Sequence, residues 1–125
     1  MIVLDAGVLI ALLDNGDAHH AAATELFSRE GSPYLVHPLT MAEVLVGPAR
    51  AGREHEVWRD LQAIGVEIAD LGAGEAIALA RLRARARLKM PDTCVLATAE
   101  HFRMPLATFD QQLAATADQM ALLVE

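Results

Sequence analysis

The chain has 125 residues, of which 54% are hydrophobic, so a single core can form without disulfides or structural metals. The formal net charge of −7 argues against a protein that coats nucleic acid nonspecifically, because such binding needs many Lys and Arg contacts to phosphate. No apolar stretch approaches the roughly 20 residues of a membrane span, and Met1 leads directly into a strand-like run instead of a basic leader. We expect one cytoplasmic domain, residues 1–125, with no membrane partner.

Strand-like and helix-like stretches alternate along the chain. In the first half they are a strand at Met1–Leu4, helical stretches at Val8–Leu13 and from Asp17 to Phe27, a strand at Tyr34–Val36, a helix that Thr40 can cap, and a helix at Arg53–Ile64. In the second half they are a strand at Val66–Leu71, a helix at Gly74–Leu88, a helix that begins near Asp92 after Pro91, and strands at Met104–Ala107 and Met120–Val124. This order predicts a three-layer α/β/α sandwich around a mainly parallel central sheet.

Acidic residues stand where such a sheet would place a ligand site. Asp5 directly follows the first strand, and Asp110 follows the apolar stretch at Leu106–Phe109. Glu43 lies one helical turn into the element after the second strand, and Asp92 lies where the last expected helix begins. Ligands of open α/β sheets bind beyond the carboxyl ends of the strands, so we expect these four acids to share one crevice.

A cluster of carboxylates predicts a divalent cation. Like charges a few ångströms apart raise one another's pKa and oppose folding, and a cation reverses that balance. Mg²⁺ or Mn²⁺ prefers oxygen ligands and can bridge carboxylates to a substrate phosphate. Such a site would activate a water for attack on phosphorus and stabilise the leaving oxygen.

Each acid also has a purely structural interpretation. Glu43 can be the capping-box partner of Thr40, and Asp92 can be a helix N-cap after Pro91. Asp110 can be a turn residue, and Asp5 a strand-end cap. Asp5 is the hardest to explain in this way, because it stands between two apolar runs where an unpaired carboxylate would be costly.

Four segments resemble the acidic motifs of the PIN-domain ribonucleases, in particular the VapC toxins of toxin–antitoxin pairs. The first is Met1-Ile-Val-Leu-Asp5 with Val8-Leu-Ile, and the second is Met41-Ala-Glu43-Val-Leu with Gly47. The third is Pro91-Asp92 through Ala97-Thr98-Ala99, and the fourth is Leu106-Ala-Thr108-Phe-Asp110. The four occur in the family's order and spacing, and the resemblance covers nearly the whole chain.

The resemblance implies a PIN fold and endonucleolytic cleavage of RNA, often tRNA or rRNA, that depends on Mg²⁺ or Mn²⁺. It also implies a homodimer and a cognate VapB-type antitoxin whose C-terminal segment fills the active groove. Carried over residue by residue, the metal-binding and catalytic acids are Asp5, Glu43, Asp92 and Asp110. Thr108 matches a hydroxyl residue that orients a carboxylate or water; its plain interpretation is a β-branched strand residue.

The chain departs from the family pattern just after the first acid. Relatives often carry Ser, Thr or Asn one or two positions later, whereas this chain has Ala6 and Gly7. Loss of such an outer hydrogen bond typically costs about 10- to 100-fold in metal affinity or activity. A catalytically weak or inactive PIN-fold module that sequesters antitoxin or RNA is therefore the alternative function.

Five of the ten Lys and Arg residues fall between Arg81 and Lys89. Arg81 and Arg85, and likewise Arg83 and Arg87, are like-charged i, i+4 pairs, which slightly destabilise an isolated helix. An anionic partner would relieve that repulsion, so these arginines, with Arg50, Arg53 and Lys89, are candidates to guide RNA phosphates or to contact the antitoxin. The competing interpretation is a solvated helix face.

The cysteine and the two adjacent histidines are expected to have no catalytic role. Cys94 is expected to be a small buried apolar residue, and His19 and His20 are expected to be solvated, because adjacent helical side chains diverge by about 100°. Aromatic residues make up only 4% of the chain, which predicts RNA recognition through shape and backbone and not through base stacking.

Two other enzyme-like classes fit poorly. A receiver-type signalling domain needs an Asp near the end of its third strand and a late Lys, but the only Lys is Lys89 and no Asp lies between Asp17 and Asp60. An aspartate-nucleophile phosphatase would need a second Asp two residues after the first, where this chain has Gly7.

Overall fold

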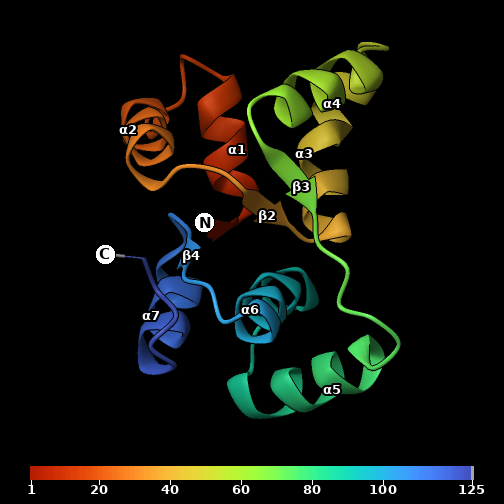
Figure 1. Ribbon diagram of the computed structural model, residues 1–125, viewed down its shortest axis with the longest axis vertical. Coiled ribbons are helices and arrows are strands. Elements are labelled where there is room, and N and C mark those ends of the chain that lie inside the picture. Colours follow the sequence, from red (N-terminus) through yellow and green to blue (C-terminus); the bar gives the residue numbers. More distant parts are fainter. Residues whose placement is uncertain (125) are drawn as a thin grey trace.

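The computed structural model describes residues 1–124, which form helices on both sides of a small sheet (Figure 1). Its elements in chain order are β1 (Ile2–Leu4), α1 (Ala6–Leu13), α2 (His20–Glu30), β2 (Tyr34–Val36), α3 (Pro38–Arg50), α4 (Glu54–Ala63), β3 (Val66–Ile68), α5 (Glu75–Ala86), α6 (Met90–Phe102), β4 (Leu106–Ala107) and α7 (Gln111–Gln119). The expected α/β class is confirmed.

The four strands are all parallel and are ordered β3-β2-β1-β4. Val3 pairs with Leu35 of β2 on one side and with Leu106 of β4 on the other. The chain adds β2 and β3 on one side of β1 and then crosses to add β4 on the opposite side. The strand order therefore reverses between β1 and β4, and a ligand crevice is expected at the carboxyl ends of these two strands.

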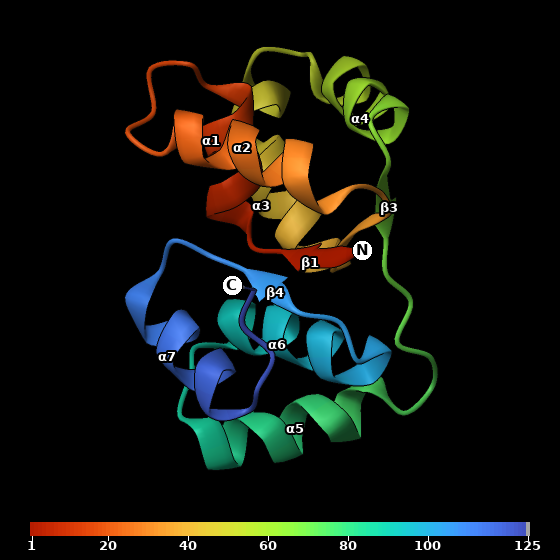
Figure 2. The same cartoon turned by 60° about the vertical axis from the view of Figure 1, so that its left-hand side comes forward.

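Two apolar cores lie on opposite faces of the sheet. Ile2 and Leu4 pack with α1, α2, α3 and α4, whereas Val3 packs with α5, α6 and α7, as the alternation of side chains along a strand requires. Figure 2 shows the two groups of helices above and below the sheet. Because both faces are covered, the strands read as continuous apolar runs in the sequence.

The start of α3 differs from the expectation. The helix begins at Pro38, not after Thr40, because the ring Nδ1 of His37 accepts a hydrogen bond from the Leu39 N–H (3.0 Å) and caps it. Proline suits the first helical turn, since its missing N–H is not needed there. Thr40 is buried, and its hydroxyl has no hydrogen-bond partner among the described residues. The proposed capping box between Thr40 and Glu43 is wrong.

Other boundaries also needed correction. The helix expected from Asp92 begins at Met90, so Asp92 lies in its first turn and Lys89 occupies the cap position. The strand expected at Met120–Val124 is reduced to one parallel bridge between Leu123 and Leu106. Helix α7 was not predicted, although Asp110 caps it and Leu113 and Ala117 form its buried face. Within residues 1–124, no helix has both the length and the apolar character needed to cross a membrane.

Candidate metal centre

Asp5 is fixed at the carboxyl end of β1 by hydrogen bonds to both carboxylate oxygens. Its Oδ1 accepts from the Ala6 N–H (2.8 Å), which caps helix α1. Its Oδ2 accepts from the hydroxyl of Thr108 (2.6 Å), which follows β4. Asp5 is therefore oriented by hydrogen bonds from Ala6, which follows β1, and from Thr108, which follows β4.

Thr108 also positions Asp110. The Thr108 hydroxyl oxygen accepts a hydrogen bond from the Asp110 N–H (3.0 Å) while it donates to Asp5. The Asp110 carboxylate in turn accepts from the Leu113 N–H (2.9 Å) as the N-cap of α7. One hydroxyl thus ties the ends of β1 and β4 and the start of α7 together.

Glu43 and Asp92 project from α3 and α6 and interact with the other acids through their charges. Burial, followed by the charges of Asp5 and Asp92, raises the pKa of Glu43. Burial, followed by the charges of Asp5 and Asp110, raises the pKa of Asp92 more than Lys89 lowers it. Asp5 thus acts on both carboxyls, and every acid of the expected set is electrostatically coupled to another.

The structural interpretations divide the four acids into two pairs. Asp5 and Asp110 do cap helices, as that interpretation requires. Glu43 caps nothing, because His37 caps α3, and Asp92 lies inside the first turn of α6 without a hydrogen bond among the described residues. Two carboxylates are thus held in place, and the other two have no capping role or hydrogen bond within residues 1–124 that would explain their position.

These four side chains do not form a preassembled ligand cluster. Within residues 1–124, no group of three or more His, Cys, Asp or Glu side chains is arranged so that it could hold a metal ion as it stands. The donor set nonetheless fits a hard divalent cation, because all four candidates are carboxylates and hard cations take oxygen ligands. Burial raises the pKa of Glu43 and Asp92 most, and repulsion from neighbouring acids adds to it; that repulsion is the cost that such a cation would remove.

Comparison with known protein families decides the classification. Residues 2–119 match the family described as PIN domain. The chain belongs to the PIN domain family. No curated protein is similar enough in sequence to match.

Solved structures share the PIN fold over almost the whole chain. A toxin–antitoxin complex from Klebsiella pneumoniae has 23% identity and a TM-score of 0.81, covering 100% of this chain and 97% of that chain. VapC20 from Mycobacterium tuberculosis, described as a sarcin–ricin loop cleaving toxin, has 20% identity and a TM-score of 0.71. The match covers 92% of this chain and 94% of that chain. VapBC2 from Rickettsia felis, bound to a DNA fragment from its promoter, has 14% identity and a TM-score of 0.66. The match covers 99% of this chain and 96% of that chain.

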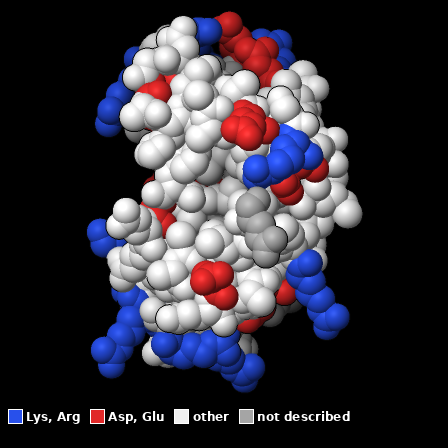
Figure 3. Space-filling view, turned by 90° about the vertical axis from the view of Figure 1, so that its left-hand side faces the viewer, with Lys and Arg blue, Asp and Glu red and all other residues white. Residues whose placement is uncertain are grey.

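A basic strip, meaning the segment from Arg81 to Lys89, spans the second half of α5 and the residues between α5 and α6. Arg81, Arg83, Arg85, Arg87 and Lys89 are all exposed. Within residues 1–124 only Arg85 of these five forms an ion pair, with Glu100, and Lys89 is close enough to Asp92 to lower its pKa. Figure 3 shows basic side chains gathered at the lower end of the molecule, where α5 lies, and a hollow between the upper and lower halves.

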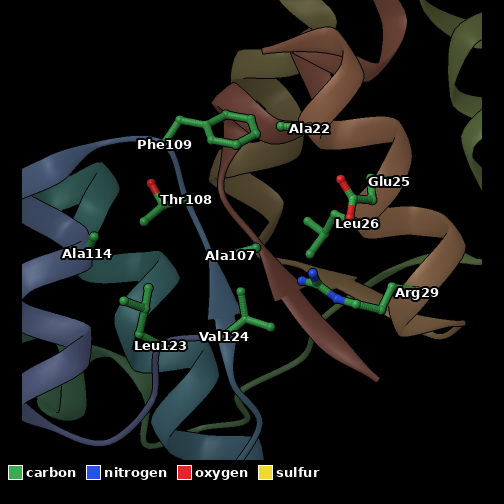
Figure 4. Close-up of a pocket in the computed structure, with 10 residues that line it drawn as sticks. All are labelled: Ala22, Glu25, Leu26, Arg29, Ala107, Thr108, Phe109, Ala114, Leu123 and Val124. Atoms are coloured by element: carbon green, nitrogen blue, oxygen red, sulfur yellow. The ribbon is translucent and has the colours of Figure 1, made fainter.

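Two concave surfaces contain residues of the expected site, Thr108 in one and Glu43 in the other. A pocket of about 320 Å³ lies between α2 and the segments around β4 and α7; Thr108 and Phe109 stand at one end of it and Arg29 at the other (Figure 4). A smaller apolar groove of about 230 Å³ lies between α1 and α3, lined by Ile10, Leu13, Asp14, Glu43, Val44, Gly47 and Pro48. Glu43 therefore belongs to the groove as well as to the acidic set.

Sequence reasoning missed a pair of stacked rings in the PIN domain. The ring of His19 stacks on that of Phe109, with centroids 4.3 Å apart and planes inclined by 12°. The ring Nδ1 of His20 lies 2.8 Å from the carbonyl oxygen of Ala11. The expectation of two solvated histidines is therefore wrong for His20 and incomplete for His19. A pairing between residues 90 positions apart leaves no local sequence signal.

Cys94 takes the role expected for it. Its side chain is buried in α6, and burial, followed by the charges of Glu75 and Glu43, raises the pKa of the thiol. A raised pKa lowers the thiolate fraction, and the thiolate is the nucleophile, so this cysteine is a packing residue.

Proposed function

We propose that this PIN domain is a metal-dependent endoribonuclease and the toxin of a VapBC-type toxin–antitoxin pair. It would hydrolyse RNA phosphodiester bonds, with tRNA or rRNA as the substrate class that the family resemblance suggests. Membership of the PIN domain family supports the reaction class. The likeness of its fold to toxins, one of them described as cleaving the sarcin–ricin loop, supports the biological role.

The proposal is supported by four carboxylates whose charges act on one another, two of which, Asp5 and Asp110, follow the strands β1 and β4 between which the strand order reverses. Asp5 and Asp110 are fixed by hydrogen bonds, whereas Glu43 and Asp92 have raised pKa values that come in part from neighbouring acids. A protein that needed these residues only for stability would gain nothing from gathering like charges. A site that receives a cation and a phosphate requires such a gathering.

Asp5, Glu43, Asp92 and Asp110 would hold Mg²⁺ or Mn²⁺. When bound, that cation would make a water nucleophilic near neutral pH and stabilise negative charge on the scissile phosphate and its leaving oxygen. Asp5 provides the fixed ligand, because Ala6 and Thr108 hold both of its oxygens. Glu43 and Asp92 would provide the other ligands, since neither carboxylate caps a helix.

Thr108 is a positioning residue in this account. Its hydroxyl donates its only proton to Asp5 and accepts the Asp110 N–H, so it keeps two of the acids at a constant separation. Reaction sites benefit from such preorganised ligands, because small displacements of the ligands reduce metal affinity.

RNA would approach along the basic strip that runs from Arg81 to Lys89. The net charge of the chain is negative, so a local cluster of exposed cations is where phosphates would be attracted. Lys89 lies at the boundary between this strip and Asp92. The strip would therefore bring the RNA backbone to the edge of the carboxylates.

The apolar groove between α1 and α3 suits a segment of the antitoxin. Ile10 and Leu13 are exposed apolar side chains on its α1 wall, and Glu43 at its border would attract a cationic side chain. A peptide in the groove would thus block RNA and neutralise a metal ligand at once. The homodimer implied by the resemblance belongs to the same proposal and is measurable by light scattering.

The decisive activity experiment uses purified protein freed of antitoxin. We would incubate it with total cellular RNA in Mg²⁺, Mn²⁺ or EDTA, next to an Asp5→Asn variant, and map the new RNA ends. We expect discrete ends that require metal and are absent with Asp5→Asn. Absence of cleavage by folded, inhibitor-free protein in every condition would refute the nuclease and favour a module that binds RNA or antitoxin without catalysis.

A further inference from the structure

Two stacked rings stand next to the acidic site and have no part in the proposed reaction. Phe109 lies between Thr108 and Asp110 in the chain, and the His19 ring covers one of its faces. Phe109 is partly buried against the core that contains Ile2 and Leu4, whereas His19 is exposed. Phe109 covers one face of the imidazole, and no aromatic ring of the described residues stacks on the opposite face.

The loop before α2 holds His19 in this place. The Asp17 carboxylate accepts from the His19 N–H (2.8 Å), and the Asp17 carbonyl accepts from the His20 N–H (3.1 Å). The contact between His20 Nδ1 and the Ala11 carbonyl ties the following residue to α1. Because the backbone on both sides of His19 is fixed, its ring loses little additional freedom when a second ring stacks on it.

Phe109 fixes the opposite side of the pair. Figure 4 shows its side chain reaching from the segment after β4 across to Ala22 near the start of α2. The segment that carries Phe109 is itself held by Thr108, which bonds to both Asp5 and the Asp110 N–H. The exposed imidazole face is therefore held at the rim of the acidic site by contacts with both halves of the molecule.

A flat, exposed and fixed aromatic face suits a nucleobase. Unpaired RNA bases stack on aromatic side chains, including histidine, and such stacking tolerates any base because each has a π-face. Flexible single-stranded RNA is also the form whose bases are free to turn out of a stack. The position beside the carboxylates would place such a base close to the phosphate that is cleaved.

We propose that His19, supported by Phe109, is a stacking platform for one unpaired nucleobase of the RNA substrate. This inference rests on the proposed ribonuclease function and deepens it, because it names the substrate as RNA that is unpaired near the cleaved bond. It replaces the expectation of recognition by shape and backbone alone. The ligand contributes its π-face, so the platform selects for an unpaired base and not for a sequence.

The test is stacking of a fluorescent base in the intact protein. A short single-stranded oligoribonucleotide carrying 2-aminopurine is titrated with protein in Ca²⁺, with the RNA checked for integrity, and fluorescence quenching reports stacking. The variants are His19→Ala, His19→Phe and, as a matched control, His55→Ala, which removes an exposed histidine from α4. Circular dichroism verifies that each variant is folded.

We expect quenching with the wild type and with His55→Ala, and a 5- to 150-fold weaker affinity, on the order of one lost base stack, with His19→Ala. His19→Phe should restore both quenching and affinity, because it keeps the aromatic face. The platform is refuted if His19→Ala binds and quenches like the wild type, or if the wild type does not quench.

The same variants separate this inference from the proposed function. If the His19→Ala variant cleaves total RNA normally with metal and its stacking is unchanged, the platform is refuted and the nuclease function stands. Loss of stacking in His19→Ala beside a wild type that never cleaves RNA would support the platform and refute the nuclease.

Discussion

Asp5 and Thr108 show at the residue scale how a site can be built from segments 103 positions apart. We predict that Thr108→Val lowers metal affinity and cleavage by about 10- to 100-fold, because the Asp5 carboxylate loses its hydroxyl partner. Thr108→Ser keeps the hydroxyl and should retain most of the activity. Cleavage rates measured across a Mg²⁺ titration check this. Equal activity of the Val and Ser variants would show that the hydroxyl has no positioning role.

Glu43 gives a prediction about pH at the same scale. Its folded-state pKa is raised, so its contribution to stability is present below the ordinary carboxyl range and is lost as the pH rises through the raised pKa. In EDTA, Glu43→Gln should therefore be more stable than the wild type at about pH 7 and similar to it at about pH 3.5. Urea unfolding at both pH values tests this. A stability difference independent of pH would contradict it.

The residue scale is also where sequence reasoning was most informative. The motif resemblance singled out Asp5, Glu43, Asp92 and Asp110, and the structure couples these acids electrostatically. The motifs could not show that Asp5 and Asp110 cap helices whereas Glu43 and Asp92 do not, because a cap depends on the backbone around it. The ring stack of His19 and Phe109 stayed hidden because nothing in either segment signals the other.

His37 joins two elements from opposite sides of the sheet. Its Nδ1 accepts from the Leu39 N–H at the start of α3, so its Nε2 carries the proton that is donated to Glu75 at the start of α5. We predict that His37→Ala lowers the free energy of unfolding by about 1–3 kcal/mol, because it removes a helix cap and a hydrogen bond to a charged group.

His37→Asn supplies another good capping side chain and should recover part of that loss. His55→Ala, at an exposed position of α4, is the control and should change stability by no more than about 0.5 kcal/mol. Denaturant unfolding of the three variants provides the comparison. If His37→Ala were as stable as His55→Ala, the link between α3 and α5 would not contribute to stability.

Helix α5 carries the prediction on substrate approach. Arg83 and Arg87 are exposed and form no ion pair within residues 1–124. Reversing both charges to Glu should weaken binding of RNA or of the antitoxin. For RNA, the slope of log affinity against log salt concentration should become less steep by about 0.7–0.9 for each phosphate that the variant no longer neutralises. Arg59→Glu, an exposed reversal on α4, is the matched control. Unchanged affinity for both partners would leave α5 as a solvated helix.

Errors at the scale of elements have local causes. The start of α3 was misplaced because Thr40 and Glu43 mimic a capping box, although Pro38 in the sequence already favoured an earlier start. The length of the last strand was overestimated, because an apolar run does not show how many of its backbone groups pair with a neighbouring strand. Helix α7 was missed because its apolar face has only Leu113 and Ala117 as buried residues.

At the scale of the whole molecule, the alternation of elements predicted the α/β class but not the strand order. Placing β4 beside β1 depends on contacts between distant segments, and this placement brings the residues after both strands together. Family resemblance supplied what local patterns lacked. We propose that this topology gathers the carboxylates that receive a divalent cation.

Direct binding of Mn²⁺ tests that claim without depending on a substrate. We would titrate the folded, antitoxin-free protein with Mn²⁺ by calorimetry, beside Asp92→Asn and Glu43→Gln, which remove charge from the two acids that cap no helix. We predict saturable binding by the wild type and at least about tenfold weaker binding by both variants. Absence of binding by the wild type, or equal binding by all three proteins, would contradict a metal centre at this site.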